Sequence, residues 1–243
     1  MKPTFIFIFA LLLNFFHTSR AGTNDFFARG TALAQAGNFP EAGAVLEKEV
    51  KRQPSAGALV NLGIAEWQRG HAGAAILAWE RAQWIDPYNT NAVNDLKFAR
   101  AVAQVDEPPL KWFEITSTWL PPNAWVWIAG ASLWLAIGVL VLPRVFRWEK
   151  SGWQQTLAAL GLGIFIFSVT ASYGVVSRTN LGFVLRKNVP LQMTPTQGGE
   201  IVSILTAGEP ARRIRSRGNF YFIRTSLASG WVARENIGLV VGE

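Results

Sequence analysis

Histidine and cysteine, which supply many catalytic bases, nucleophiles and soft metal ligands, are scarce in this chain. Its 243 residues include two histidines and no cysteine. Without cysteine there is no disulfide framework, no thiolate nucleophile and no cysteine-ligated zinc or iron–sulfur site. His71 follows Gly70 in a predicted turn, with no nucleophile or orienting carboxylate identifiable beside it, so we interpret it as an exposed turn residue. Phosphate-loop, dinucleotide, HExxH and paired-carboxylate motifs are absent. The sequence therefore predicts a protein that is not an enzyme and has no cofactor and no metal site.

The chemistry that the sequence does carry is cationic. Arg213, Arg215 and Arg217 alternate along a predicted strand, so we expect them to share one face, with Arg212 beside them. Two interpretations are open: a solvated strand edge that resists pairing, or a face that touches anionic lipid or an acidic partner. The net charge is +7, but residues 22–110 hold eight Lys/Arg against ten Asp/Glu. Because the excess does not cover the whole chain, nucleic acid is not expected as a partner.

The elements that position these residues begin with an apolar N-terminus. Half of the residues are hydrophobic and 16% are charged, against roughly 25% charged in an ordinary soluble chain. Lys2 precedes an apolar run over 5–16, and small side chains follow at Ser19 and Ala21. This pattern predicts a secretory signal peptide over 1–21, since the run is too short to span a membrane comfortably. A retained, tilted N-terminal anchor is the alternative.

Two later apolar stretches predict a membrane hairpin. The first transmembrane helix is expected over 123–143 and the second over 156–177, because each stretch covers the roughly 30 Å hydrocarbon core. Tryptophans flank both stretches. The loop 144–155 carries three cations, so the positive-inside rule predicts a cytoplasmic loop in the bacterial inner membrane. Neither stretch holds an ionisable residue, which favours anchoring over transport. The small residues Ala158, Gly161 and Gly163 are expected to mark helix–helix packing.

Residues 22–105 contain an internal repeat. An offset of 33 residues superimposes Gly30 on Gly63, Gly37 on Gly70, Ala42 on Ala75 and Pro54 on Pro87. These residues, with Trp79 and Ala82, resemble the tetratricopeptide family, which implies paired helices in a stack. A further helical stretch over 91–100 looks like a cap for the open end of that stack. The prolines and charges of 106–122 predict a linker.

The tetratricopeptide resemblance implies a concave groove that binds a partner protein. The implied groove residues are Asn24, Phe27, Thr31, Gln35, Val60, Ile64, Trp67, Gln68, Asn91 and Asn94. A purely structural role for these residues, in the core or on a solvated helix face, stays open, because two repeats make a shallow groove.

The C-terminal part, 178–243, predicts a small all-β barrel. Short β-rich runs lie at 184–186, 199–205, 211–217, 220–224 and 230–232, separated by turn residues. The segments Leu205–Glu209, Asn219–Arg224 and Gly230–Ala233 resemble the bacterial SH3 family. Relatives of that family often bind peptide or peptidoglycan, which makes a cell-wall receptor the alternative function.

The order of modules gives the whole-chain interpretation. The fold class is a multidomain membrane protein with α-helical tetratricopeptide repeats, two transmembrane helices and an SH3-like barrel. This order is similar to the BatE-like aerotolerance family. The resemblance implies a non-enzymatic scaffold that works with membrane proteins carrying von Willebrand factor A (VWA) domains and with a MoxR-type ATPase in stress or oxygen tolerance. Repeats and barrel would both be periplasmic; proteins, membrane lipid and peptidoglycan are the expected partners.

Overall fold

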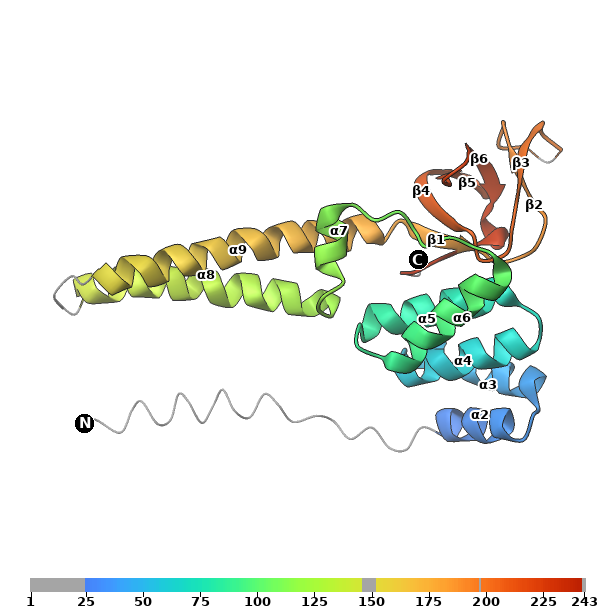
Figure 1. Cartoon of the computed structure of the whole chain (residues 1–243), viewed down its shortest axis with the longest axis horizontal. Coiled ribbons are helices and arrows are strands. Elements are labelled where there is room, and N and C mark those ends of the chain that lie inside the picture. Colours follow the sequence, from blue (N-terminus) through green and yellow to red (C-terminus); the bar gives the residue numbers. More distant parts are fainter. Residues whose placement is uncertain (1–24, 146–151, 197, 242–243) are drawn as a thin grey trace.

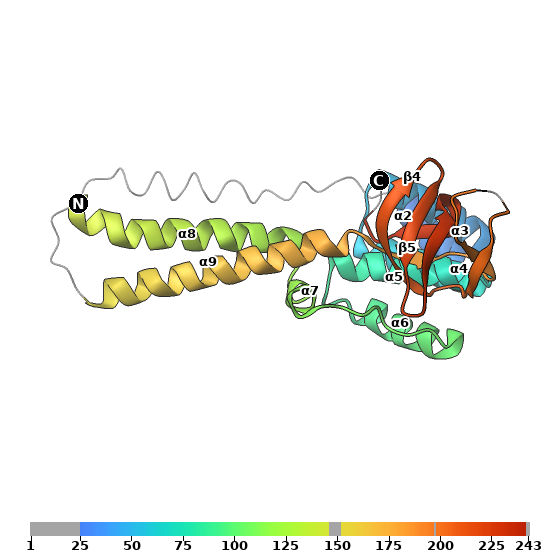
Figure 2. The ribbon, with the colours of Figure 1, turned by 90° about the horizontal axis from the view of Figure 1, so that it is seen from above.

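The computed structural model describes residues 25–145, 152–196 and 198–241. They form a helical unit, a long helical hairpin and a β unit (Figure 1). The predicted signal peptide over 1–21 and the groove residue Asn24 lie outside the described residues, as do positions 146–151 of the predicted loop 144–155. Both units sit at the same end of the hairpin, which extends away from them (Figure 2).

The helical unit comprises the described helices α2 (Asp25–Gln35), α3 (Phe39–Arg52), α4 (Ala56–Gln68), α5 (Ala72–Ile85) and α6 (Thr90–Ala103). Side-chain caps begin three of them: Asn38, Ser55 and Asn89 each accept a hydrogen bond from a backbone amide of the first turn. Between α2 and α3, and again between α4 and α5, a glycine takes a left-handed conformation that other residues rarely adopt, with φ of +77° at Gly37 and +80° at Gly70.

The 33-residue repeat recurs in the packing of this unit. Gly30 of α2 faces Leu46 of α3, and 33 residues later Gly63 of α4 faces Trp79 of α5; a Cβ on either glycine would overlap the opposite side chain. Ala42 and Ala75, also 33 apart, are both fully buried. Small residues therefore allow the same close approach within each helix pair.

Within the described residues, two helices are long and apolar enough to cross a membrane: α8 (Pro122–Val145) and α9 (Gly152–Arg178). Only 17% and 22% of their most apolar stretches are buried, so their outward side chains need an apolar surrounding. The contact between them uses small residues, with Gly161 against the Ser132 carbonyl and Ala136. Ala158 is buried as predicted, whereas Gly163 faces open space, so the prediction that Gly163 marks packing is wrong.

The segment predicted as a linker over 106–122 contains a short helix, α7 (Trp112–Ser117), that packs on the end of α9. The backbone at Phe113 comes so close to Gly174 of α9 that a Cβ there would overlap it. The Trp125 indole donates to the Ser117 carbonyl at 3.2 Å, which fixes the start of α8 beneath α7. This stretch is thus an ordered junction between the helical unit and the hairpin.

The β unit is an antiparallel sheet with the order β3-β2-β6-β5-β4-β1-β7 among its described strands. The strands are β1 (Leu181–Val184), β2 (Val189–Gln192), β3 (Ile201–Leu205), β4 (Pro210–Arg217), β5 (Phe220–Arg224), β6 (Ser229–Ala233) and β7 (Ile237–Leu239). The sequence placed the first strand too late, at 184–186, and missed β2 and β7. Pro190 within β2 and the three-residue length of β7 explain these misses, because proline and short runs weaken a strand pattern.

A β-bulge in β4 places the arginines of this strand on different faces of the sheet, contrary to the prediction. The register shifts between Arg213 and Arg215, so these residues lie opposite Ile223 and Phe222, which are consecutive in β5 and point to opposite faces. Arg213 is on the face of the buried Tyr221 and Ile223, whereas Arg215 is on the outer face. The prediction that Arg213, Arg215 and Arg217 share one face is therefore wrong.

One hydrophobic core crosses the boundary between the helical and β units. Its buried members include Leu59, Val60, Ile76, Leu77, Trp79 and Leu96 from α4–α6, and Leu181, Phe183 and Val240 from the β unit. Gly73 of α5 lies directly on the backbone carbonyl of Val184. Arg81 donates to the Leu239 carbonyl from Nε at 3.1 Å and from Nη2 at 2.8 Å. The two units are therefore docked, with β1 and β7 against α5.

Candidate functional site at the junction of the helical and β units

The predicted groove residues divide between a helix face and the core. Phe27 and Thr31 of α2 lie beside α4: the Phe27 ring approaches Gly57, and the Thr31 hydroxyl accepts a 2.9 Å hydrogen bond from Asn61. Trp67 of α4 meets Phe98 of α6 edge-on, with ring centroids 5.7 Å apart. α4 therefore lies between α2 and α6.

The remaining predicted residues differ in their exposure. Gln35, Ile64, Gln68, Asn91 and Asn94 are exposed. Val60 is only 4% exposed and belongs to the core, so its assignment to the groove is wrong. Helical spacing could not separate these cases, because core and groove positions of a stacked helix lie close together around its axis.

A cavity of about 420 Å³ opens where the C-terminal ends of α4 and α6 meet the β unit. Its lining comprises Trp67, Gly70, Ala72, Val102, Ala103, Lys187, Asn188, Thr206 and Ala207. Of the predicted groove residues, Trp67 alone is in this lining. Phe98 and Val102, 57% and 58% exposed, extend the apolar surface on α6. The cavity combines apolar walls with Lys187, Asn188 and Thr206 from two turns of the β unit, which suits a peptide segment.

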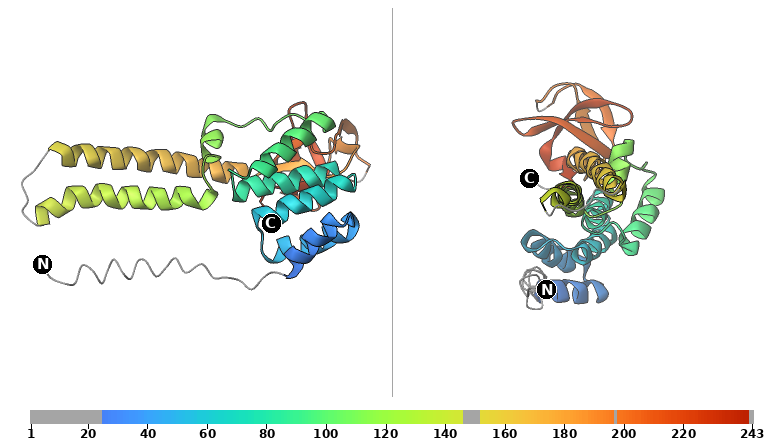
Figure 3. Two further views of the ribbon diagram at one scale, coloured as in Figure 1. Left: turned by 60° about the horizontal axis from the view of Figure 1, so that its bottom comes forward. Right: turned by 90° about the vertical axis from the view of Figure 1, so that its left-hand side faces the viewer.

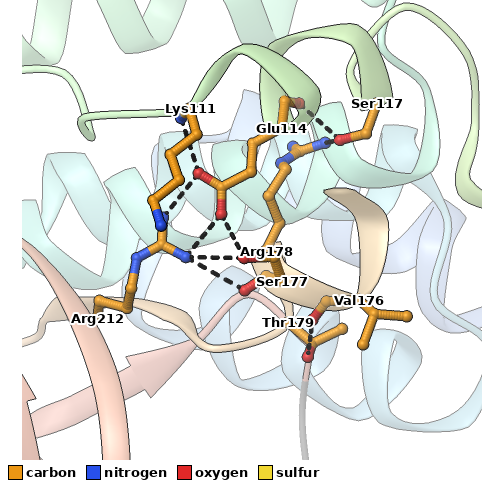
Figure 4. A network of polar contacts seen from close by, with 8 residues as sticks. All are labelled: Lys111, Glu114, Ser117, Val176, Ser177, Arg178, Thr179 and Arg212. Carbon is orange, nitrogen blue, oxygen red and sulfur yellow. Dashed lines mark hydrogen bonds and ion pairs between the residues drawn. The ribbon is translucent and has the colours of Figure 1, made fainter. Parts of the chain in front are cut away.

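A second feature of the junction is a network of polar contacts around Glu114 of α7 (Figure 4). The carboxylate of Glu114 is fully buried and accepts two hydrogen bonds from Arg212 of β4, at 2.7 Å to Oε1 and 3.0 Å to Oε2. Ser177 at the end of α9 donates to Oε1 at 2.5 Å, and the Lys111 amide donates to Oε2 at 2.9 Å. Glu114 thus joins the junction helix α7, the helical hairpin of α8 and α9, and the β unit.

The sequence predicted that Arg212 belongs to an open basic surface. In the structure it is instead a structural residue that pairs with Glu114. Burial by itself would raise the pKa of Glu114, but the hydrogen bonds from Arg212, Ser177 and the Lys111 amide, with the charge of Arg212, outweigh it and lower that pKa. Glu114 is consequently ionised at neutral pH. No local sequence signal could identify this pair, whose members are 98 positions apart.

Arg178 extends the network toward the helical unit. Its guanidinium donates to the Ser117 hydroxyl at 3.3 Å and lies 4.9 Å from the centre of the Trp84 ring. Glu80 of α5 forms an ion pair with Arg100 of α6 close by. Burial raises the pKa of Glu80, while Arg100 and Arg178 oppose that rise. Charges from α5, α6 and α9 therefore meet where the hairpin enters the junction.

His71, at the turn between α4 and α5, lies beside a carboxylate. His71 is exposed, as the sequence predicted, but the prediction that no orienting carboxylate lies beside it is wrong, because its Nδ1 is 2.6 Å from Glu66 Oε2. Arg69 pairs with the other oxygen of that carboxylate at 2.5 Å. In the parts of the chain that the structure describes, no group of three or more His, Asp or Glu side chains could hold a metal ion.

Comparison of the chain with protein-family models, with curated proteins and with solved structures finds no match. Its class is therefore defined by its own architecture: a helical unit and a β unit docked on one another at one end of an apolar helix pair.

Proposed function

We propose that the protein is a membrane-anchored scaffold that holds a segment of a partner protein at the junction. The observation that carries this proposal is the cavity of about 420 Å³ between α4, α6 and the β unit, continuous with the exposed Phe98 and Val102. An extended peptide would lie along α4 and α6 and end between the turns at Lys187 and Thr206. Because both units contribute to the lining, binding depends on their docking.

The proposed class is a tetratricopeptide-repeat protein with a bacterial SH3-like barrel, inserted by two passes in the bacterial inner membrane. The 33-residue recurrence of helix packing supports the first part, and the small antiparallel β unit supports the second. We propose that both units are periplasmic and that the predicted loop 144–155 is cytoplasmic, on the charge pattern of that loop. On the order of modules, we propose a BatE-like role with VWA-domain membrane proteins in stress or oxygen tolerance.

Co-purification of the tagged full-length chain with VWA-domain membrane proteins encoded beside it tests this proposal. The variant Phe98→Asp/Val102→Asp places two charges at the cavity and should abolish recovery of the partner. The control Ile201→Asp alters an equally exposed apolar residue at the opposite end of β3 from Thr206, and should leave recovery unchanged. Equal recovery with both variants would contradict the assignment of the cavity. Recovery of peptidoglycan instead would favour the cell-wall receptor.

A further inference from the structure

Positive charge is concentrated in the segment from β4 to the end of β6 and the residue that follows it. Residues 210–234 contain six arginines and no aspartate or glutamate. Three of the six hold this segment to its surroundings or to the inner face: Arg212 contacts Glu114, Arg213 contacts Asn180 and the Tyr221 ring, and Arg234 contacts the same ring. The other three, Arg215, Arg217 and Arg224, are exposed and form no ion pair with an acidic side chain among the described residues.

These three arginines share the outer face of the sheet. Arg215 lies opposite Phe222, and Arg217 lies opposite Phe220. Phe220, Phe222 and Arg224 alternate along β5, so their side chains are on one side, away from the buried Tyr221 and Ile223. The outer face therefore combines cations with aromatic rings, and we call Arg215, Arg217 and Arg224 the outer arginines.

Arg212 shows in which direction this face is turned. It lies opposite Arg224, so it belongs to the same outer face, and its guanidinium reaches Glu114 of α7 and the Ser177 hydroxyl at the end of α9. The face is thus turned toward the end of the hairpin that adjoins the units. A view along the hairpin from its far end shows the orange and red strands of the β unit above the hairpin helices, which do not cover them (right panel of Figure 3).

Aromatic packing pre-organises the central arginine. The Arg215 guanidinium lies 4.9 Å from the centre of the Phe222 ring and 5.7 Å from that of Trp231, and the two rings meet edge-on at 5.3 Å. A guanidinium held over rings loses less conformational freedom on binding, and its planar donors suit phosphate oxygens.

We propose that the outer arginines bind the headgroups of anionic phospholipids in the leaflet from which the hairpin emerges. The charge of the face is complementary to that leaflet, and the link through Arg212 and Glu114 keeps the face toward it. The hairpin therefore anchors the chain, while the β unit adopts a fixed orientation on the bilayer surface. Each arginine is expected to increase the population of the bound orientation about fivefold at low salt.

The full-length chain in lipid nanodiscs provides the test. Because the chain has no cysteine, Ser229→Cys, opposite Arg224 on the outer face, can carry a single polarity-sensitive fluorophore. In discs that contain phosphatidylglycerol the label should shift to the blue and lose access to acrylamide, compared with discs of phosphatidylcholine alone. A label at Ala101→Cys, on α6, should respond equally in both. Incorporation of the chain into discs reports membrane insertion independently of either response.

Charge variants complete the test. The variant Arg217→Gln/Arg224→Gln should reduce the lipid-dependent shift severalfold. It leaves Arg215 and its contacts with the Phe222 and Trp231 rings in place. Adding Arg215→Gln should abolish the shift. The control Arg186→Gln/Lys48→Gln removes two exposed cations, one from the turn between β1 and β2 and one from α3, and should retain the shift. An equal response in both lipids, or a shift that survives the triple change, would overturn the proposal. An outer face that stays exposed in anionic discs but is protected by an acidic protein would assign it to a protein partner.

Discussion

Glu114 is fully buried, and donors from separate segments hold its carboxylate: Arg212 of β4, Ser177 of α9 and the Lys111 amide before α7. Glu114→Gln keeps the shape but removes the charge, so it leaves the Arg212 guanidinium, 28% exposed, without its counter-ion. We expect a loss of about 2 kcal/mol in the free energy of unfolding, less than for a fully buried pair because Arg212 can reach water. Urea unfolding of the detergent-solubilised protein measures this loss.

Glu107→Gln is the matched control for that change. Glu107 also faces an arginine, with 3.6 Å between its Oε1 and Arg100 Nη1, but it is 77% exposed. Exposed ion pairs contribute little because water screens them. An unfolding midpoint that shifts as much for Glu107→Gln as for Glu114→Gln would contradict the structural role of the Glu114 network.

The pH dependence of stability should separate Glu114 from Glu80. The pKa of Glu114 is lowered on folding, so its contribution is present above the unfolded pKa and is lost only as the pH falls through the lower folded pKa. The pKa of Glu80 is raised, so stability should increase as the pH falls from neutral through that raised value. The free energy of unfolding should be measured against pH. Its increase as the pH falls from neutral should disappear in Glu80→Gln and persist in Glu114→Gln.

At this scale, sequence patterns identify residue types but not their long-range partners. The exposed His71 is as predicted because a glycine turn precedes it. Arg212 and Val60 differ from their predicted roles. Arg212 pairs with Glu114 from a distant segment, and Val60 packs in the core beside Trp79, whose indole donates to the Val60 carbonyl. Both outcomes depend on tertiary contacts that no local spacing contains.

Docking of the helical and β units depends on the element contact between α5 and β1. Gly73 of α5 lies on the Val184 carbonyl, and a Cβ there would overlap backbone atoms. Gly73→Ala should therefore weaken docking by about 2 kcal/mol. Hydrogen exchange of the β1 and α5 amides should accelerate. Gly57→Ala is the control. Its Cβ would lie 3.8 Å from the Phe27 ring, an ordinary van der Waals distance, so this variant should be neutral or slightly stabilising.

The helix pair α8 and α9 gives a matched test within one element. A Cβ added to Gly161 would lie 3.0 Å from the Ser132 carbonyl oxygen, whereas Gly163 faces open space. Gly161→Leu should separate the helices and cost about 1–3 kcal/mol, whereas Gly163→Leu should be tolerated. Thermal unfolding in detergent measures the difference. If the two variants unfold at the same temperature, the helices do not pack through Gly161.

Elements with a strong period are predicted well from this sequence, and irregular ones are not. The apolar runs anticipate α8 and α9 to within a few residues, and the 33-residue offset anticipates the two helix pairs. The bulge at Ile214 shifts every later residue of β4 by one face, and an alternation count cannot detect it. The helix α7 was missed because its six residues lie in a segment rich in proline and charge.

For the whole molecule, the shared core and the Glu114 network join three parts that the sequence presents as separate. The helical unit packs on β1 and β7 through α5, and the hairpin is tied to both through Arg178, Ser177 and α7. Within the described residues, packed side chains and hydrogen bonds therefore connect all three parts.

The topology of the whole chain can be tested with single cysteines. Both units lie at one end of the hairpin (Figure 1), so Ala101→Cys on α6 and Ser229→Cys on β6 should react from the same side of the membrane. In intact spheroplasts a membrane-impermeant maleimide should label these two and should leave Ser151→Cys, between the two apolar stretches, unlabelled until lysis, because the cations of that loop favour the cytoplasm. Labelling of Ser151→Cys alone would invert the orientation. Labelling of only one of the other two would contradict a two-pass hairpin.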